Sequence, residues 1–326
     1  MKVFGLVTYA LHGGVAVALL AGCGTPAPTG APGAMSQTGA AAYANRGKPW
    51  MLPEAKREDL LYVTNSGRGS HGSGGSVSVL SYPKGTLVGQ LTAFSDPDGA
   101  CVDNVGNVFL SDDNYRQIFE YAHGGSQAVR TLADQQQPVG CSIDPLSGNL
   151  AVANIDGSVA IYRNAKGSPE MYHDPILIDA YYCAYDDSGN LFVDGFNYYS
   201  ENHNFQFAEL PNGKRRFTNM TLNETLETPV GVQWDGKYIT VGDGWSGNHA
   251  VYRVQASGPQ GIVKRKISLT SALPEGYWID GKRLINPDFF AGQVEFFNYP
   301  AGGSATKVIT SGIGLPSAAT VSLVPK

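Results

Sequence analysis

Short runs of alternating apolar and polar residues recur along most of the chain, each about five residues long and bounded by Gly, Asn, Asp or Pro. Alternation with a period of two predicts β-strands rather than helices. One group of runs follows a Gly-Asn or Gly-Lys turn in five copies, and a sixth copy lacks that turn. The six copies are LLYVTN (60–65), GNVFLSD (106–112), GNLAVAN (148–154), GNLFVDG (189–195), GKYITVGD (236–243) and GKRLINPD (281–288).

Each copy belongs to a larger unit of four predicted strands. A run such as PDGACVD (97–103) precedes the copies after the first, a run such as SVAIYRNAKG (158–167) follows each, and a weaker run such as AVRTLA (128–133) comes last. Residues 59–326 then divide into six units of about 45 residues, the length of a four-stranded propeller blade. A β-sandwich and an open solenoid are the alternative arrangements of such a repeat.

The two ends of the chain favour a closed ring. The first unit starts at its second strand, LLYVTN, and LPSAATVSLVPK (315–326) resembles the missing first strand. We therefore expect Ala318 to Leu323 to insert as the innermost strand of the first blade, which removes an open sheet edge. The predicted fold is all-β: a six-bladed β-propeller of four-stranded antiparallel blades, closed by pairing of the C-terminal strand with the first blade.

The same runs carry a family resemblance. Tyr62-Val63-Thr64-Asn65, followed by Val77-Ser78-Val79, resembles the YVTN-type bacterial propeller repeat, and GNVFLSDDNYRQIFEY (106–121) resembles NHL repeats. The resemblance covers residues 59–326 and implies the propeller fold. It implies little about function, because such repeats occur in scaffolds, binding proteins and enzymes.

The N-terminus has the features of an export signal. Lys2 is followed by the mostly apolar stretch 3–20, and Leu20-Ala21-Gly22-Cys23 resembles the lipobox of bacterial lipoproteins, which implies lipidation of Cys23. An uncleaved anchor helix or a soluble export signal with a chance cysteine are the alternatives. We predict a signal peptide (1–23), an Ala/Gly/Pro-rich tether (24–49) and a propeller domain (50–326) that is extracytoplasmic and lipid-anchored to a bacterial membrane, in the periplasm or at the cell surface.

Charge excludes one class of partner. The formal net charge is −5, and the longest basic clusters are the triplets 214–216 and 264–266. Nucleic-acid binding requires a broader basic surface, so we expect no nucleic-acid partner. We expect a monomer.

Candidate binding residues lie where the repeat is interrupted. The fourth to sixth units carry irregular aromatic loops at the predicted channel mouth, which suit a carbohydrate, peptide or protein ligand. The alternative is that these aromatic side chains pack between blades. The candidates are Tyr181, Tyr182, Tyr198, Tyr199, Trp245, Tyr277, Trp278 and Phe289.

Asp or Asn recurs at the end of the second strand in every unit, as at Asn65, Asp112 and Asp243. These side chains could form a cation or sugar site, or could accept hydrogen bonds from backbone N–H groups in their own turns; recurrence in every blade favours the second interpretation. No nucleophile elbow, phosphate loop or His-Glu-x-x-His motif occurs. We therefore expect no cofactor, metal ligand or catalytic residue, and a non-catalytic binding or interaction platform. The alternative is a propeller hydrolase or lactonase with a channel metal, by resemblance to the gluconolactonase family, whose motifs are not matched.

Three cysteines lie in predicted inner strands. Cys141 and Cys183 occupy equivalent positions in adjacent units, and Cys101 is offset so that it points to the opposite face of its strand. Equivalent inner-strand residues are expected to be too far apart for a disulfide. We therefore expect all three to be buried, reduced side chains.

Overall fold

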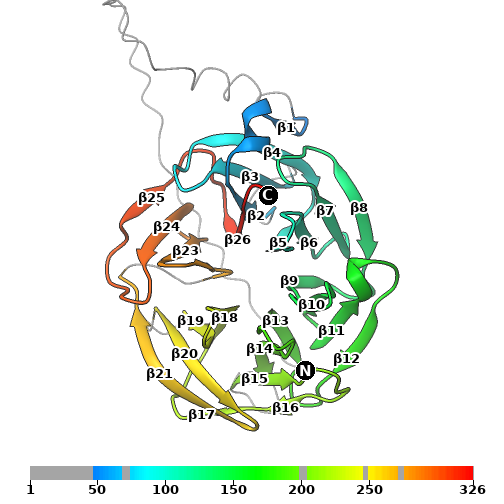
Figure 1. The fold of residues 1–326 in the computed structure, drawn as a ribbon, viewed down its shortest axis with the longest axis vertical. Helices are drawn as coiled ribbons and strands as arrows, with labels where there is room; N and C mark the ends of the chain where they lie inside the picture. Colours follow the sequence, from blue (N-terminus) through cyan, green and yellow to red (C-terminus); the bar gives the residue numbers. More distant parts are fainter. Residues whose placement is uncertain (1–46, 68–73, 198–203, 245–248, 271–274, 326) are drawn as a thin grey trace, which may run out of the picture. The chain divides into compact units, whose positions relative to one another are not determined.

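The computed structural model of the chain describes residues 47–67, 74–197, 204–244, 249–270 and 275–325, and all of them belong to one compact unit, Thr38–Lys326. They form six antiparallel sheets arranged as blades around a central axis, as Figure 1 shows. The predicted all-β, six-bladed propeller is confirmed. No helix in the described ranges is long and apolar enough to cross a membrane.

Each of the first three blades runs from an inner strand at the axis to an outer strand at the rim. Blade 1 also has a short fifth strand on its outer edge. In order from the axis, the strands are β26 (Pro316–Ser322), β2 (Leu60–Asn65), β3 (Gly75–Ser81), β4 (Leu87–Phe94) and β1 (Trp50–Met51) in blade 1; β5 (Pro97–Val102), β6 (Val108–Asp112), β7 (Gln117–Tyr121) and β8 (Ala128–Ala133) in blade 2; and β9 (Pro138–Ile143), β10 (Leu150–Asn154), β11 (Ser158–Tyr162) and β12 (Glu170–His173) in blade 3.

The other three blades repeat this order, with one parallel strand added at the rim of blade 5. Their strands are β13 (Asp179–Tyr185), β14 (Leu191–Asn197), β15 (Asn204–Leu210) and β16 (Thr218–Asn219) in blade 4; β18 (Pro229–Trp234), β19 (Ile239–Asp243), β20 (Ala250–Ser257), β21 (Gln260–Ser268) and β17 (Thr221–Leu222) in blade 5; and β22 (Trp278–Asp280), β23 (Arg283–Asp288), β24 (Gln293–Asn298) and β25 (Lys307–Ile309) in blade 6. Two 3₁₀ turns, η1 (Pro53–Arg57) and η2 (Arg163–Ala165), complete the described elements.

The C-terminal strand closes the ring in blade 1 as expected. β26 pairs with β2 in antiparallel register, with Val63 opposite Ala319. The Thr64 hydroxyl accepts a hydrogen bond from the backbone N–H of Ala318 at 2.8 Å. Because β2 pairs with β3 on its other side, this insertion leaves β2 without an open edge.

Both faces of each blade are buried, which explains why the strands are rich in Ala, Val and Leu. In β2, Leu60 and Tyr62 pack with Val108 and Leu110 of blade 2. The alternate residues of β2, Leu61 and Val63, pack with blade 6 instead. Apolar residues therefore fill the wedges between blades, and the loops at the two ends of the strands remain as surfaces for binding.

These two surfaces are named by the loops they carry, with the strands of each blade lettered A to D from the axis outward. The AB face carries the loops that join each inner strand (A) to the second strand (B) of its blade, such as 103–107. The BC face carries the loops that follow each second strand, such as 113–116, and the loops that enter the inner strands.

Candidate functional site

Glycines in the inner strands bring neighbouring blades into backbone contact around the axis. A Cβ added to Gly99 of β5 would lie 1.9 Å from the Val139 carbonyl oxygen, and one added to Gly140 of β9 would lie 2.6 Å from the Tyr181 carbonyl oxygen. The cavity that the inner strands enclose on the axis is about 10 Å³, which is room for roughly one water molecule. Ligand binding at mid-depth of the channel is therefore sterically blocked.

The same close packing allows a disulfide between blades. Cys101 in β5 and Cys141 in β9 are bonded, with Cα atoms 5.6 Å apart. The expectation that both are reduced is wrong, because glycine brings the inner strands within bridging distance. The predicted opposite orientation of Cys101 is correct, and it is the reason the two side chains meet between blades 2 and 3. Cys183 is buried and free, as expected.

At five of the six second-strand ends, the recurring Asp or Asn side chain accepts hydrogen bonds from backbone N–H groups. At the sixth, Asn154 donates to the Ser158 hydroxyl, and its Oδ1 has no hydrogen-bond partner in the described part of the chain. Four of the bonds from backbone N–H groups join Asn65 Oδ1 to Gly314 N (2.7 Å), Asp112 Oδ2 to Ser95 N (2.7 Å), Asp243 Oδ1 to Thr228 N (3.1 Å) and Asp288 Oδ1 to Ala291 N (3.0 Å). These contacts favour a structural role. The predicted donors were in the same turn, however, and of these four only Ala291 N lies there, while Gly314, Ser95 and Thr228 lie in loops that enter inner strands.

Asp194 is the extreme case of this pattern. Its side chain is fully buried, and it accepts hydrogen bonds from the N–H groups of Tyr182 at 2.8 Å and Gly231 at 3.3 Å. Burial raises the pKa of Asp194 to about 8 despite these bonds. The carboxyl joins the inner strands of blades 4 and 5 and makes their junction sensitive to pH.

The predicted binding aromatics lie in different environments. The side chain of Tyr277 is 1% exposed, and its ring lies against Gly231. Its hydroxyl group shares a hydrogen bond of 2.9 Å with the Thr240 hydroxyl. Tyr182 is also buried and packs with residues of blades 4 and 5. Burial raises the pKa of both phenols well above its ordinary value. For these two side chains the structure favours packing between blades over ligand contact.

Three other candidates retain partial exposure. Tyr181 packs edge-on against Phe196, with ring centroids 5.7 Å apart. Phe289 makes the same kind of contact with the exposed Phe290 at 5.5 Å on the BC face. Trp278 lies in β22 and lines a hollow on the AB face, at the opposite end of the channel from the predicted mouth. Tyr198, Tyr199 and Trp245 lie outside the described residues.

Two features of the BC face could hold a ligand. Carboxylate oxygens of the buried residues Asp96, Asp98 and Asp113 lie within 4.8 Å of one another, and oxygen ligands in such an arrangement suit a hard cation. Asp96 also accepts a hydrogen bond from the backbone N–H of Gly67 at 2.9 Å. A separate hollow of about 380 Å³ lies between β15 and β17 and is lined by Phe205 and Phe207.

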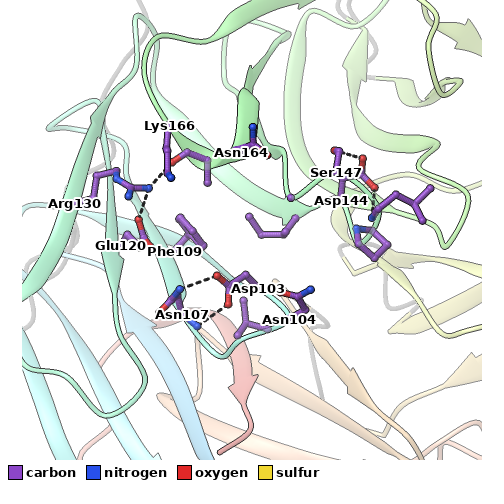
Figure 2. A pocket seen from close by; sticks show the side chains of 16 residues that line it. Asp103, Asn104, Asn107, Phe109, Glu120, Arg130, Asp144, Ser147, Asn164 and Lys166 are labelled. Carbon is purple, nitrogen blue, oxygen red and sulfur yellow. Dashed lines mark hydrogen bonds and ion pairs between the residues drawn. The ribbon is translucent and has the colours of Figure 1, made fainter. Parts of the chain in front are cut away.

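A hollow on the AB face lies between blades 2 and 3. Its volume is about 730 Å³, within the range of ligand sites. Figure 2 shows polar side chains around it: Asp103, Asn104 and Asn107 from the 103–107 loop, Asp144 and Ser147 from the next blade, and Arg130, Glu120, Asn164 and Lys166 toward the rim. Phe109 and Ile143 add apolar surface.

Ion pairs and turn bonds fix the polar walls of this hollow. Arg130 pairs with Glu120 at 2.9 Å and donates to the Ala165 carbonyl at 2.9 Å. Burial raises the pKa of Glu120, while Arg130 lowers it. Asp103 accepts hydrogen bonds from the backbone N–H and the side-chain amide of Asn107, both at 2.8 Å. The walls are thus preformed, which reduces the entropy lost on binding.

A second hollow of about 510 Å³ adjoins the first around the 103–107 loop. The two share Val102, Asp103 and Asn104. The second is mostly apolar, with Trp278, Ile279 and Val321 among its lining residues. Val105, Leu146 and Leu323 at the rims of the hollows are 57%, 64% and 54% exposed.

Sequence reasoning missed the AB face. The signal was present in the turns after the inner strands, where Val105 and Leu146 occupy the turn position that carries Ser188 in blade 4 and Lys237 in blade 5. Their side chains are apolar and exposed, whereas the equivalent residues of blades 4 and 5 are polar.

Comparison with known proteins identifies the fold and no more. No protein-family model matches the chain, and no curated protein matches it. Among solved structures, a chain in the crystal structure of a nidogen/laminin complex is similar, with a TM-score of 0.64 and 15% identity over 82% of this chain and 99% of that chain.

Two bacterial proteins of unknown function are also similar in structure. The protein from Bacteroides caccae gives a TM-score of 0.59 and 12% identity over 81% of this chain and 99% of its own. The protein from Desulfotomaculum acetoxidans gives a TM-score of 0.57 and 12% identity over 82% of this chain and 99% of its own. The structural similarity supports the propeller fold. Because the sequence identities are low, it says nothing about the function of this chain.

Proposed function

We propose that the protein is a non-catalytic interaction platform whose AB face binds a partner protein. The observation that carries this proposal is the pair of adjoining hollows, about 730 and 510 Å³, with exposed apolar side chains at their rims. Apolar anchors beside preformed polar groups are the usual composition of the centre of a protein interface. One of the similar structures is a protein complex, that of nidogen and laminin, which is consistent with this use of the fold.

The two hollows suit an extended segment of the partner. An apolar side chain of the partner would fill the second hollow against Trp278 and Val321, and polar groups would meet Asn104 and Asp144 in the first. A carbohydrate is the other ligand class that amide-rich walls suit, and it becomes one outcome of the test.

Site-specific photo-crosslinking in intact cells tests this proposal. A photoreactive residue at Val105 or Leu146 should capture one partner protein, and Leu323→Asp should abolish that capture. The matched control is Val129, which is 60% exposed on the outer strand β8 and should capture nothing. Equal capture from Val129 and Val105 contradicts the proposal, whereas glycan-array binding that is lost in Leu323→Asp points to a carbohydrate.

The platform is proposed to be held at an extracytoplasmic membrane surface by lipid on Cys23. The disulfide between Cys101 and Cys141 supports an oxidising compartment, since structural disulfides are rare in the cytosol. Metabolic labelling with an alkyne fatty acid should mark the wild-type protein and not Cys23→Ser, which should move to the soluble fraction. Equal membrane association of the two contradicts the anchor.

A hydrolase or lactonase with a bound metal is the second candidate. The observation that favours it is the group Asp96, Asp98 and Asp113, whose oxygens lie within 4.8 Å of one another. Elemental analysis before and after chelation, with a panel of ester and lactone substrates, separates the two. Chelator-sensitive turnover that is lost in Asp98→Asn favours the enzyme.

A further inference from the structure

Four oxygen-bearing side chains form a patch on one surface of blade 6. In β23, Asn286 and Asp288 are two residues apart and so lie on the same face of the strand. Across the β23–β24 ladder, Glu295 is directly opposite Asn286, and Gln293 is directly opposite Asp288. Directly opposed residues project from one face of a sheet, so these four side chains are neighbours.

The patch faces blade 5 and is nearly closed to water. The same face of blade 6 carries Leu284 and Phe297, which pack against Val251 and Ile267 of blade 5. The exposed fractions are 0% for Asn286, 4% for Glu295 and 5% for Asp288. The small exposure of Asp288 places it at the edge of the patch nearest the BC face.

Hydrogen bonding leaves part of the patch unsatisfied. Gln293 Nε2 donates to Glu295 Oε1 at 3.1 Å, and the Ala291 N–H donates to Asp288 Oδ1 at 3.0 Å. Glu295 Oε2 and both polar atoms of the Asn286 amide have no hydrogen-bond partner of normal geometry. Buried polar atoms nearly always have a partner, so these atoms indicate that something else completes the patch.

The carboxyl groups of Glu295 and Asp288 are both buried and repel each other when both are ionised. Burial and then repulsion from Asp288 raise the pKa of Glu295 to about 7, while the adjacent amides of Asn286 and Gln293 lower it. The groups that act on Glu295 are thus one acid and two amides. A bound cation would compensate the charge of both carboxylates and satisfy the amide oxygen.

We propose that Asn286, Asp288 and Glu295 form a binding site for a divalent cation that prefers oxygen ligands, with Ca²⁺ as the best match. Glu295 Oε2, Asn286 Oδ1 and the Asp288 carboxylate supply the protein ligands, and Gln293 holds the Glu295 carboxyl in position. Ca²⁺ accepts such mixed carboxylate and carbonyl oxygens with flexible geometry. Two carboxylates match the millimolar affinity of extracellular calcium modules.

The Asp96, Asp98 and Asp113 group is a separate place in blade 2, and the patch is also separate from the AB-face hollows. The proposal therefore stands or falls independently of the proposed platform function. Its consequence is mechanical, because the cation would join β23 to β24 within blade 6 on the face that packs against blade 5.

Thermal unfolding of the full chain in EDTA and in about 5 mM Ca²⁺ tests the site. The wild type should gain several degrees in Tm with Ca²⁺, and Glu295→Gln should show no gain. In EDTA, Glu295→Gln should melt at or above the wild-type temperature, because the neutral amide removes the buried repulsion. Asp187→Asn, which neutralises an exposed carboxylate in blade 4, is the control and should keep the full Ca²⁺ shift.

Equilibrium dialysis against Ca²⁺ provides the direct count. We expect Glu295→Gln and Asn286→Ala to bind one Ca²⁺ ion fewer per chain than the wild type, and Asp187→Asn to bind the wild-type number. The proposal is overturned if the wild type binds no Ca²⁺, or if Glu295→Gln binds as many ions as the wild type.

Discussion

Cys101 and Cys141 join the inner strands of two consecutive blades through a disulfide, at a point where each side chain leaves its own strand toward the other. The bond lies beside Gly99 and Gly140, whose lack of a side chain brings the strands together. It therefore locks blade 2 to blade 3 at the axis, where relative movement of the blades would otherwise begin.

Removing this bond should destabilise the ring. The double variant Cys101→Ala/Cys141→Ala is expected to lose roughly 2–4 kcal/mol of unfolding free energy, because the disulfide closes a loop of intermediate length. Urea unfolding of both proteins measures the difference, and Cys183→Ala, which keeps the bond, is the control. Alkylation of Cys101 in the native, unreduced protein contradicts the bond itself.

Inner-strand glycines should tolerate no side chain. Gly99→Ala places a methyl group 1.9 Å from the Val139 carbonyl oxygen, so we expect a loss of about 3 kcal/mol or more as the strands separate. Gly314→Ala is the matched control, since its added Cβ would make ordinary contacts of 3.4 Å or more with Asn65. Equal melting temperatures for the two variants would show that β5 and β9 can move apart enough to admit a methyl group at Gly99 without loss of stability.

Deleting residues 315–326 should unfold the whole propeller rather than one blade. Without β26, β2 loses its inner partner and the wedge between blades 6 and 1 loses Ala319 and Val321. Circular dichroism and gel filtration report the loss, and a chain that lacks only Pro325 and Lys326 serves as control. A compact, cooperatively melting protein without β26 contradicts closure through this strand.

Stability should fall as pH rises through the range set by Asp194. Its pKa is about 8 in the folded protein and near 4 in the unfolded chain, so between these values the folded state holds more protons and rising pH favours unfolding. The stabilisation is complete below about pH 4 and is lost by about pH 8. Asp194→Asn should flatten this dependence, so the Tm difference between wild type and variant should change by several degrees from pH 5 to 9. Parallel curves for the two proteins contradict the assignment to Asp194.

The strand pattern was sufficient to predict the fold because a blade needs little more than four short alternating runs and suitable turns. The end match between LPSAATVSLVPK and the inner-strand runs even identified β26, although the strand begins at Pro316, two residues before the prediction. These features are local, so sequence alone records them.

Contacts between blades are not local, and prediction failed there. The distance between β5 and β9 depends on Gly99 and Gly140 facing carbonyl groups across the boundary, which no single-strand pattern contains. For the same reason the sequence left open whether Tyr277 lines the channel mouth or packs between blades; in the structure its ring occupies the space left by Gly231. The AB-face hollows arise from turn tips of different blades and become visible only when the ring is assembled.

The pairing of β26 with β2 also has a consequence for how the protein is made. Every other strand of the ring leaves the ribosome before β26, so the growing chain presents an uncovered β2 edge throughout synthesis. Such an edge is a template for pairing with other chains. The ring can therefore shut only after the whole of residues 316–322 has been made, and the β2 edge stays open to pairing with other chains until then.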